Sequence, residues 1–197
     1  MNNIKLICIR HGETIHNSKN ITQGWYQSEL SEVGKKQVQE CVDSINEVPQ
    51  AIFYSDLLRC RQTTDILLKK FPDVSAFADW RLRERSFGAL ENKVNKDVDW
   101  NSLYSMPPDT SPYQSEPDNH FIERVRSFMR DMRFFGITEA VVVTHGGVIN
   151  RFKKILNSDH SFEKHENAKV YIIEYSLDDT KLVAKPVPEW SIDYIKN

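Results

Sequence analysis

Two mostly apolar runs in this chain each end in a histidine that is followed by glycine. Residues 4–9 lead into His11, and residues 140–144 lead into His145. Runs of this kind indicate strands buried on both faces, which is typical of parallel sheets covered by helices. In an open α/β sheet, ligands bind beyond the carboxyl ends of the strands, so both histidines are expected at the same rim. The two junctions therefore predict an α/β fold with a polar site at one edge of its sheet.

Helical periodicity alternates with strand-like runs along the chain. The helices are expected over residues 31–48, 57–71, 121–135 and 148–156, and further strands over residues 51–54, 169–175 and 182–186, of which the last two would form a hairpin. Ser31 is expected to cap the first helix, and Pro49 and Pro72 follow the ends of the first and second. Strands that alternate with helices predict a layered α/β fold.

The length and composition fit one globular domain. A chain of 197 residues has an ordinary domain size, and its 40% hydrophobic content is too high for a disordered chain. No apolar run reaches the roughly 18 residues of a membrane span. The net charge of −2 lacks the basic excess typical of nucleic-acid binders. We therefore expect a single domain over residues 1–197 that binds neither nucleic acid nor membrane.

The cysteines and the start of the chain bear on its location. Cys8, Cys41 and Cys60 are odd in number, form no Cys-x-x-Cys pair and fall in or beside expected core elements, so we predict reduced, buried thiols. The apolar run near the start is too short for a signal peptide, and cleavage there would remove His11. Both observations predict a cytoplasmic location. A homodimer is left open as an assembly.

The regular pattern fails between residues 89 and 119. This stretch is polar, is interrupted by prolines and carries scattered aromatic residues such as Trp100 and Tyr104. A loop of this length inside a domain is commonly functional or disordered. Because it follows Glu84 closely, we expect a lid-like insertion at about residues 89–119, beside the polar site.

A series of short motifs runs through the chain in a fixed order. It comprises Arg-His-Gly-Glu-Thr at residues 10–14, Asn17, Gln23-Gly24, Leu-Ser-Glu-Val-Gly at 30–34, Ser-Asp-Leu-Leu-Arg-Cys-Arg-Gln-Thr at 55–63, Leu-Arg-Glu-Arg-Ser-Phe-Gly at 82–88 and Thr-His-Gly-Gly-Val at 144–148. The series resembles the signature of the histidine phosphatase superfamily, which includes cofactor-dependent phosphoglycerate mutases. The resemblance implies a three-layer α/β/α fold with a central, mostly parallel sheet.

The resemblance also implies the catalytic residues. His11 matches the histidine that the family phosphorylates, and Arg10, Arg59 and His145 match the residues that line its phosphate pocket. Glu84 matches the family's acid/base glutamate. These residue types suit the chemistry, because the charge of a phosphate monoester must be neutralised before attack. The nucleophile can be a neutral imidazole, and the leaving alkoxide needs a proton.

Further residues are expected to bind substrate. Asn17 and the backbone N–H of Gly146 would donate to phosphoryl oxygens, and Gln23 and Gly24 match the family's Gln-Gly loop. Arg85 is left open between a substrate contact and an ordinary ion pair, since Glu-Arg at this place also occurs in the mutases.

Several other charged residues receive ordinary roles. Glu13 is the competing carboxylate, but it stands two residues from His11 and is expected to orient that loop by hydrogen bonding. Arg61 and Arg83 are expected to be solvated or ion-paired. The remaining histidines show no metal-ligand spacing and are predicted to be surface or loop residues: His16, His120, His160 and His165.

The leading functional hypothesis is a metal-independent phosphatase that needs no cofactor and hydrolyses a small phosphorylated metabolite through phospho-His11. The first alternative is a cofactor-dependent phosphoglycerate mutase. Mutases of the family carry a longer insertion with an Arg-Arg pair for the substrate carboxylate, whereas here only residues 85–144 separate Glu84 from His145 and no such pair occurs. The second alternative is a non-catalytic regulatory domain of the same fold. It is disfavoured because the nucleophile and the arginines are all present.

The chain departs from the family pattern around its expected lid. Ser115 and Pro117 flank Glu116 where many family phosphatases have glycine and serine, although Glu116 and Arg124 keep the family's spacing. These departures bear on the shape of the lid, and hence on the substrate, rather than on the chemistry.

Overall fold

A six-stranded sheet of order β3-β2-β4-β1-β5-β6 organises the computed structural model, which describes residues 2–98, 113–177 and 182–184. The strands are β1 (Asn2–Arg10), β2 (Ile52–Tyr54), β3 (Ala76–Ala78), β4 (Glu139–Thr144), β5 (Val170–Leu177) and β6 (Leu182–Ala184). The first four are parallel, whereas β5 runs antiparallel to β1 and forms a hairpin with β6. The predicted hairpin and the mostly parallel sheet are therefore confirmed, although residues 185 and 186 lie outside the described residues.

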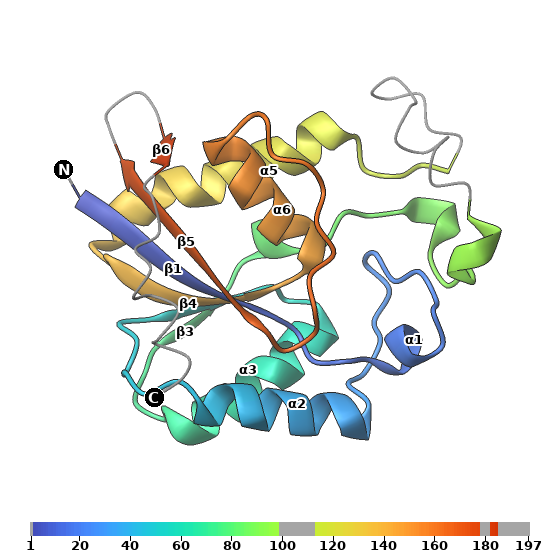
Figure 1. Ribbon diagram of the computed structural model, residues 1–197, viewed down its shortest axis with the longest axis horizontal. Helices are drawn as coiled ribbons and strands as arrows, with labels where there is room; N and C mark the ends of the chain where they lie inside the picture. Colours follow the sequence, from blue (N-terminus) through green and yellow to red (C-terminus); the bar gives the residue numbers. More distant parts are fainter. Residues whose placement is uncertain (1, 99–112, 178–181, 185–197) are drawn as a thin grey trace.

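Helices cover both faces of this sheet. In Figure 1, α2 (Glu32–Asp43) and α3 (Leu58–Lys70) lie against one face, and α5 (Asp118–Asp131) and α6 (Gly146–Leu156) against the other. Alternate residues of β1 supply the two cores. Leu6 and Cys8 pack with the residues of α5 and α6, while Ile7 and Ile9 pack with those of α2 and α3. Because residues 6–9 are all apolar and alternate between the two faces, both faces of β1 are covered by helices, as in the predicted three-layer fold.

The first predicted helix is shorter than expected. Ser31 caps α2 as predicted, because its hydroxyl accepts a hydrogen bond of 3.0 Å from the Gly34 N–H. The helix ends at Asp43 rather than near Val48, however, and the Lys70 ammonium donates to the carbonyl oxygens of Val42 and Asp43 at 2.9 and 3.0 Å. Val48 is 71% exposed, so no apolar packing extends the helix further.

Short elements fill the connections. The sequence pattern did not indicate α1 (Ile15–Ser18), β3 or the 3-10 helix η1 (Trp80–Leu82), each of which is too short for a period to show. The predicted helix over 121–135 corresponds to α5, which begins at Asp118, and the 3-10 helix η4 (Met132–Phe135) that follows it. The predicted insertion at 89–119 contains η3 (Asn95–Asp97) and overlaps η2 (Gly88–Leu90) and the start of α5, and its residues 99–112 lie outside the described residues.

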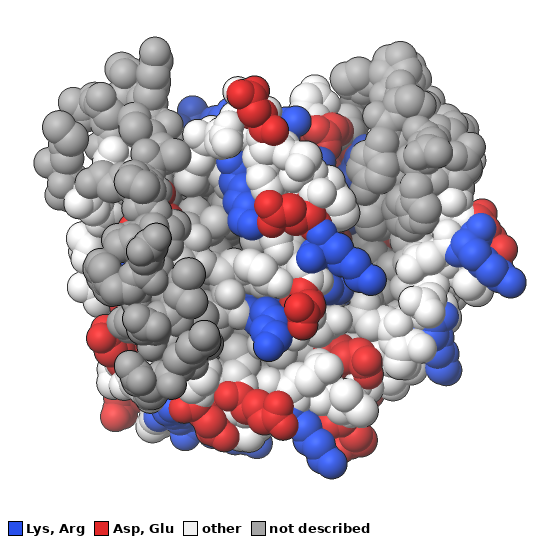
Figure 2. Space-filling view, viewed as in Figure 1, with Lys and Arg blue, Asp and Glu red and all other residues white. Residues whose placement is uncertain are grey.

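Two further sequence predictions concern thiols and membranes. All three cysteines are buried and unpaired, as predicted. Within the described ranges, the helices are too short or too polar to cross a bilayer. On the face shown in Figure 2, acidic and basic side chains are interspersed. The cytoplasmic location, the absence of a nucleic-acid partner and the homodimer stay predictions.

Candidate active site

The register of β1 and β4 brings the two histidines together. Arg10 pairs with Thr144 across the parallel strands, and the His11 N–H extends the ladder by donating to the Thr144 carbonyl at 3.0 Å. The chain turns away from the sheet after each strand, and the His11 and His145 rings meet with their centroids 5.1 Å apart at an interplanar angle of 61°. The predicted meeting of the histidines at one rim is therefore found.

Arg59 lies between the two imidazoles. It comes from the first turn of α3 and is 1% exposed, and its Nε lies 3.2 Å from both His11 Nε2 and His145 Nδ1. Its Nη1 and Nη2 donate to the carbonyl oxygens of Tyr26 and Gly24 at 3.0 and 2.7 Å. These contacts hold a permanent cation at a helix start, where the helix dipole alone disfavours it.

The ring of His11 is held in one tautomer. Its Nδ1 lies 2.8 Å from the Gly12 carbonyl, which can only accept, so Nδ1 carries the proton and Nε2 a lone pair. Burial, together with the charges of Arg59 and Arg10, holds the pKa of His11 well below its usual value. At neutral pH, the ring is therefore an uncharged base with Nε2 beside Arg59.

His145 stands behind this arrangement and is fully buried. Its Nδ1 receives the Arg59 Nε–H, so its Nε2 is the protonated nitrogen and donates to the Ser55 hydroxyl at 2.9 Å. Burial and the Arg59 charge also keep the pKa of His145 well below its usual value. His145 therefore orients Arg59 and His11 as a neutral group.

Glu84 reaches the site from the segment that follows η1. Its two carboxylate oxygens accept from the backbone N–H groups of Arg85 and Gly147 at 2.9 and 3.0 Å. Gly147 leaves the room for this contact, because a Cβ there would lie 2.0 Å from Glu84 Oε1. The second glycine after His145 thus admits the carboxylate to the start of α6.

These groups surround a cavity of about 630 Å³. Nine of the ten predicted site residues line it: Arg10, His11, Asn17, Gln23, Gly24, Arg59, Glu84, Arg85 and Gly146. His145, the tenth, is buried behind Arg59 and does not reach the cavity surface. A cavity of this size can hold a small organic molecule.

Several of the predicted substrate-binding residues are held by hydrogen bonds. The Asn17 side-chain oxygen accepts from the Thr14 N–H at 3.2 Å, and the Thr14 hydroxyl donates to Gln23 at 2.9 Å. Arg85 is 6% exposed and donates from Nε to the Glu116 carbonyl at 2.7 Å. These contacts position the residues at the cavity, and their roles toward substrate stay predictions.

The ordinary roles are mostly found. Glu13 accepts a hydrogen bond of 2.7 Å from the Ser31 hydroxyl, which ties the His11 loop to the start of α2, although Glu13 also lines the cavity. Arg83 forms the predicted ion pair, with Asp56. No group of three or more metal-ligating side chains gathers within the described ranges.

His165 lies in a loop, as predicted, but its site role was missed because the side chain is buried. This residue is 3% exposed and lines the cavity, and its carbonyl accepts a hydrogen bond from Arg10 Nη1. Burial, with a smaller effect of the Lys153 charge, lowers its pKa to about 4. Nearby, Asn167 donates to the His11 carbonyl at 2.9 Å. These residues were missed because the start of β5 lies at the rim with His11 only when β5 runs antiparallel to β1, a direction that we had not predicted.

Comparison with known proteins gives a consistent result. The model of the histidine phosphatase superfamily (branch 1) matches residues 6–186. The chain is 32% identical over 129 residues to a 2,3-bisphosphoglycerate-dependent phosphoglycerate mutase of Tropheryma whipplei, a match that covers 58% of this chain and 58% of that protein's length. It is 29% identical over 199 residues to a metal-independent phosphoserine phosphatase of Arabidopsis thaliana, covering 95% of this chain and 81% of that protein.

A solved structure shares the whole architecture. The crystal structure of a phosphoglycerate mutase from Bacillus anthracis matches with a TM-score of 0.80 over 99% of this chain and 96% of that one. The sequences are 23% identical, so this likeness concerns the fold. It agrees with the three-layer α/β arrangement.

Proposed function

Because the chain belongs to the histidine phosphatase superfamily, we propose that it is a metal-independent phosphomonoesterase acting on a small phosphorylated metabolite through a phosphohistidine on His11. The observation that carries the proposal is the state of His11. Its Nδ1 is committed to the Gly12 carbonyl, so Nε2 carries the lone pair for attack, with the Arg59 Nε–H 3.2 Å away. An uncharged imidazole can form a covalent phosphoenzyme, which splits hydrolysis into two displacements.

Positive charge for the transferred group would come from side chains. Arg59 and Arg10 both line the cavity next to His11, and the N-terminus of α6 begins at Gly146 on the same wall. Fixed cations and backbone N–H groups stabilise the charge on the transferring oxygens without reorganising. The proposed reaction therefore assigns no step to a metal ion or cofactor.

Glu84 would move the proton in both displacements. The alkoxide that leaves as phosphorus bonds to His11 Nε2 takes a proton from the Glu84 carboxyl. The resulting carboxylate then accepts a proton from the water that attacks the phosphohistidine, which frees inorganic phosphate and restores His11. The contacts of Glu84 with Gly147 and Arg85 place its carboxylate on the cavity wall.

The second candidate is a phosphoglycerate mutase, which the similarity to the mutase of Tropheryma whipplei favours. In that reaction the phosphoenzyme returns its phosphoryl group to a substrate instead of to water. Only residues 85–144 separate Glu84 from His145 in this chain, and the sequence has no Arg-Arg pair. Hydrolysis is the proposed outcome because little chain is available here to exclude water.

Rapid quench with a labelled phosphorylated substrate tests the proposal. The wild-type enzyme should give a phosphoprotein that is labile in acid and stable in base, and His11→Ala should give none. His120→Ala is the matched control, since His120 is exposed and does not line the cavity. Label that persists in His11→Ala would show that the nucleophile is another residue.

Two further measurements use the same preparation. Turnover should continue in excess EDTA, because arginines supply the charge that metal ions supply elsewhere. The phosphoryl group should appear as inorganic phosphate. Transfer of the phosphoryl group mainly to phosphoglycerate would establish the mutase instead. Turnover that stops in EDTA and returns with a divalent ion would contradict the metal-independent reaction.

A further inference from the structure

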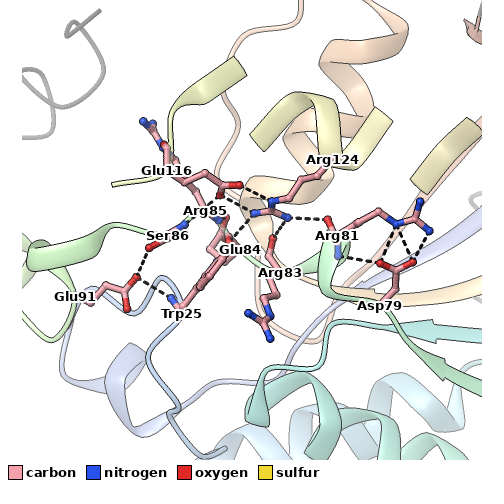
Figure 3. Close-up of polar contacts among 10 residues, drawn as sticks. All are labelled: Trp25, Asp79, Arg81, Arg83, Glu84, Arg85, Ser86, Glu91, Glu116 and Arg124. Atoms are coloured by element: carbon pink, nitrogen blue, oxygen red, sulfur yellow. Dashed lines mark hydrogen bonds and ion pairs between the residues drawn. The ribbon is translucent and has the colours of Figure 1, made fainter. Parts of the chain in front are cut away.

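Behind Glu84, a buried ion pair joins Arg124 of α5 to Glu116, with side-chain exposures of 5% and 12%. Neither residue lines the cavity. Figure 3 shows both residues beside the segment that carries Glu84, with the Arg124 guanidinium directed at the main chain of that segment. Neither side chain has a role in the reaction described above.

Every donor of the Arg124 guanidinium is used. Nε and Nη2 donate to the two carboxylate oxygens of Glu116 at 2.6 and 2.8 Å. Nη1 donates to the carbonyl oxygens of Arg81 and Arg83 at 2.7 and 2.6 Å, and Nη2 also donates to the Glu84 carbonyl at 2.9 Å. A guanidinium has five N–H groups in a fixed plane, so these contacts leave the group one orientation. Lysine, with three donors on one nitrogen, cannot reproduce them.

By binding three carbonyl oxygens, Arg124 fixes the main chain that carries Glu84. The Arg81 carbonyl lies within the short η1 and those of Arg83 and Glu84 follow it, so no longer helix or strand supplies their partners. The Glu84 carbonyl also accepts from the Trp25 indole at 2.7 Å. The main chain of Glu84 is thus held from two sides, while its carboxylate meets the start of α6.

Glu116 holds the chain on the other side of Glu84. Its N–H donates to the Ser86 carbonyl at 2.9 Å, and its Oε2 accepts from the Ser86 N–H at 3.3 Å. Its own carbonyl accepts from Arg85 Nε at 2.7 Å. The pair therefore contacts the residues before and after Glu84 without touching its carboxylate.

We propose that Arg124 and Glu116 are a positioning pair, which sets where Glu84 presents its carboxyl to the leaving oxygen. This inference rests on the proposed role of Glu84 as the proton donor. A displacement of about 1 Å in a reacting group can cost roughly 100-fold in rate. Loosening the pair should therefore act through proton donation and leave the charge stabilisation by Arg59 and Arg10 intact.

The test compares two leaving groups in single-turnover phosphorylation of His11. One substrate is p-nitrophenyl phosphate, whose phenolate leaves without a proton, and the other is the fastest alkyl phosphate found in a screen of phosphorylated metabolites. Arg124→Lys should slow the alkyl reaction roughly 10- to 100-fold and the aryl reaction less than about threefold. Glu116→Gln keeps the shape of the side chain and should show the same selectivity with a smaller loss.

Two controls separate positioning from general damage. Val125→Ala leaves a cavity in the core at a fully buried residue of the same helix. It should lower stability and change the rates with the two leaving groups by similar factors. Arg126→Lys makes the same substitution at a partly exposed ion pair and should leave both rates unchanged. Urea unfolding of all variants shows whether a slow variant is folded. If Arg124→Lys does not fold, Glu116→Gln still tests the proposal.

Glu84→Gln distinguishes failure of this inference from failure of the proposed function. If Glu84→Gln slows both substrates equally, Glu84 is not the proton donor and the proposed function loses that step. If Glu84→Gln is selective for the alkyl substrate but neither Arg124→Lys nor Glu116→Gln is, the pair has only a structural role. Selectivity in all three variants supports the positioning pair.

Discussion

The inner end of the cavity and its outer wall hold their polar groups in different ways. The inner end, defined by Arg10, His11, Arg59 and Gly146, has Arg59 in contact with two imidazoles and two carbonyls. The outer wall, defined by Phe162, Glu163 and Lys164, is exposed. Lys164 lines the cavity without a hydrogen-bond or ion-pair partner among the described residues.

The contrast separates chemistry from selectivity. A group held by several hydrogen bonds, as Arg59 is, need not reorganise as charge moves, which is what the proposed phosphoryl transfer requires. Exposed side chains with few partners can change with little cost to stability. We therefore expect substitutions at the inner end to slow every substrate, and substitutions at the outer wall to change only which substrate is preferred.

Arg59→Ala should give the largest effect. It removes the cation beside both imidazoles, so single-turnover phosphorylation should fall roughly 10²- to 10³-fold or more, and by similar factors for alkyl and aryl phosphates. Arg61→Ala, an exposed position of the same helix, is the control and should stay near the wild-type rate. If Arg59→Ala slowed only alkyl or only aryl phosphates, the inner end would contribute to substrate preference, against this expectation.

Gly147→Ala should follow. The added Cβ displaces the Glu84 carboxylate from the start of α6, so alkyl phosphates should slow roughly 100-fold while p-nitrophenyl phosphate slows much less. Gly136→Ala is the matched substitution, at a left-handed residue with no atom within 4 Å of the added Cβ. It should reduce stability by about 1 kcal/mol and leave both rates unchanged. Equal losses on both substrates in Gly147→Ala would place the damage elsewhere.

The buried histidines should make stability depend on pH. The folded pKa values of His11, His145 and His165 are all lowered, so below about pH 6.5 the unfolded chain binds more protons than the folded one. The free energy of unfolding should therefore decrease as the pH is lowered, by up to about 1.4 kcal/mol per pH unit for each histidine. The share of His165 is lost between about pH 6.5 and its folded pKa of about 4.

Urea unfolding at pH 7.5, 6.5 and 5.5 measures this dependence, and His165→Gln should reduce its slope by one histidine's share. An unchanged slope in that variant would mean that His165 titrates normally and that the wall beside Arg10 is as open as the outer wall.

Lys164→Ala should have the smallest effect. For p-nitrophenyl phosphate, kcat/KM should change less than about twofold, whereas KM for a phosphorylated carboxylic acid should rise several-fold, since an exposed ammonium gains only modest energy from a second anion. Lys154→Ala, on the exposed side of α6, is the control. A loss of kcat on both substrates would show that the outer wall takes part in the chemistry.

Site residues could be predicted from the sequence where a motif directly follows a recognisable strand. His11 and His145 follow apolar strand runs, so their place at one rim could be predicted from the fold rules for parallel sheets. Arg59 and Glu84 came from the family resemblance, and the structure places both on the cavity. Their partners could not be read from the sequence, because the carbonyls that hold Arg59 belong to a loop more than 30 residues away in the chain.

The features that were not predicted depend on contacts between residues far apart in the chain. His165 stands in a loop without a periodic pattern, and its burial depends on Arg10 and Tyr171 from the adjacent strands β1 and β5. The early end of α2 likewise depends on Lys70, which comes from the next helix. Local propensity carries no information about such partners.

The position of β1 has a consequence for the order in which the protein is made. This strand precedes both of its sheet neighbours along the chain, since β4 and β5 begin only at Glu139 and Val170. An emerging chain therefore holds an apolar strand with two open edges until β4 has left the ribosome, which invites association with other chains. Until β4 is added, the nascent chain carries His11 without His145, so Arg59 lacks one of its two imidazole partners.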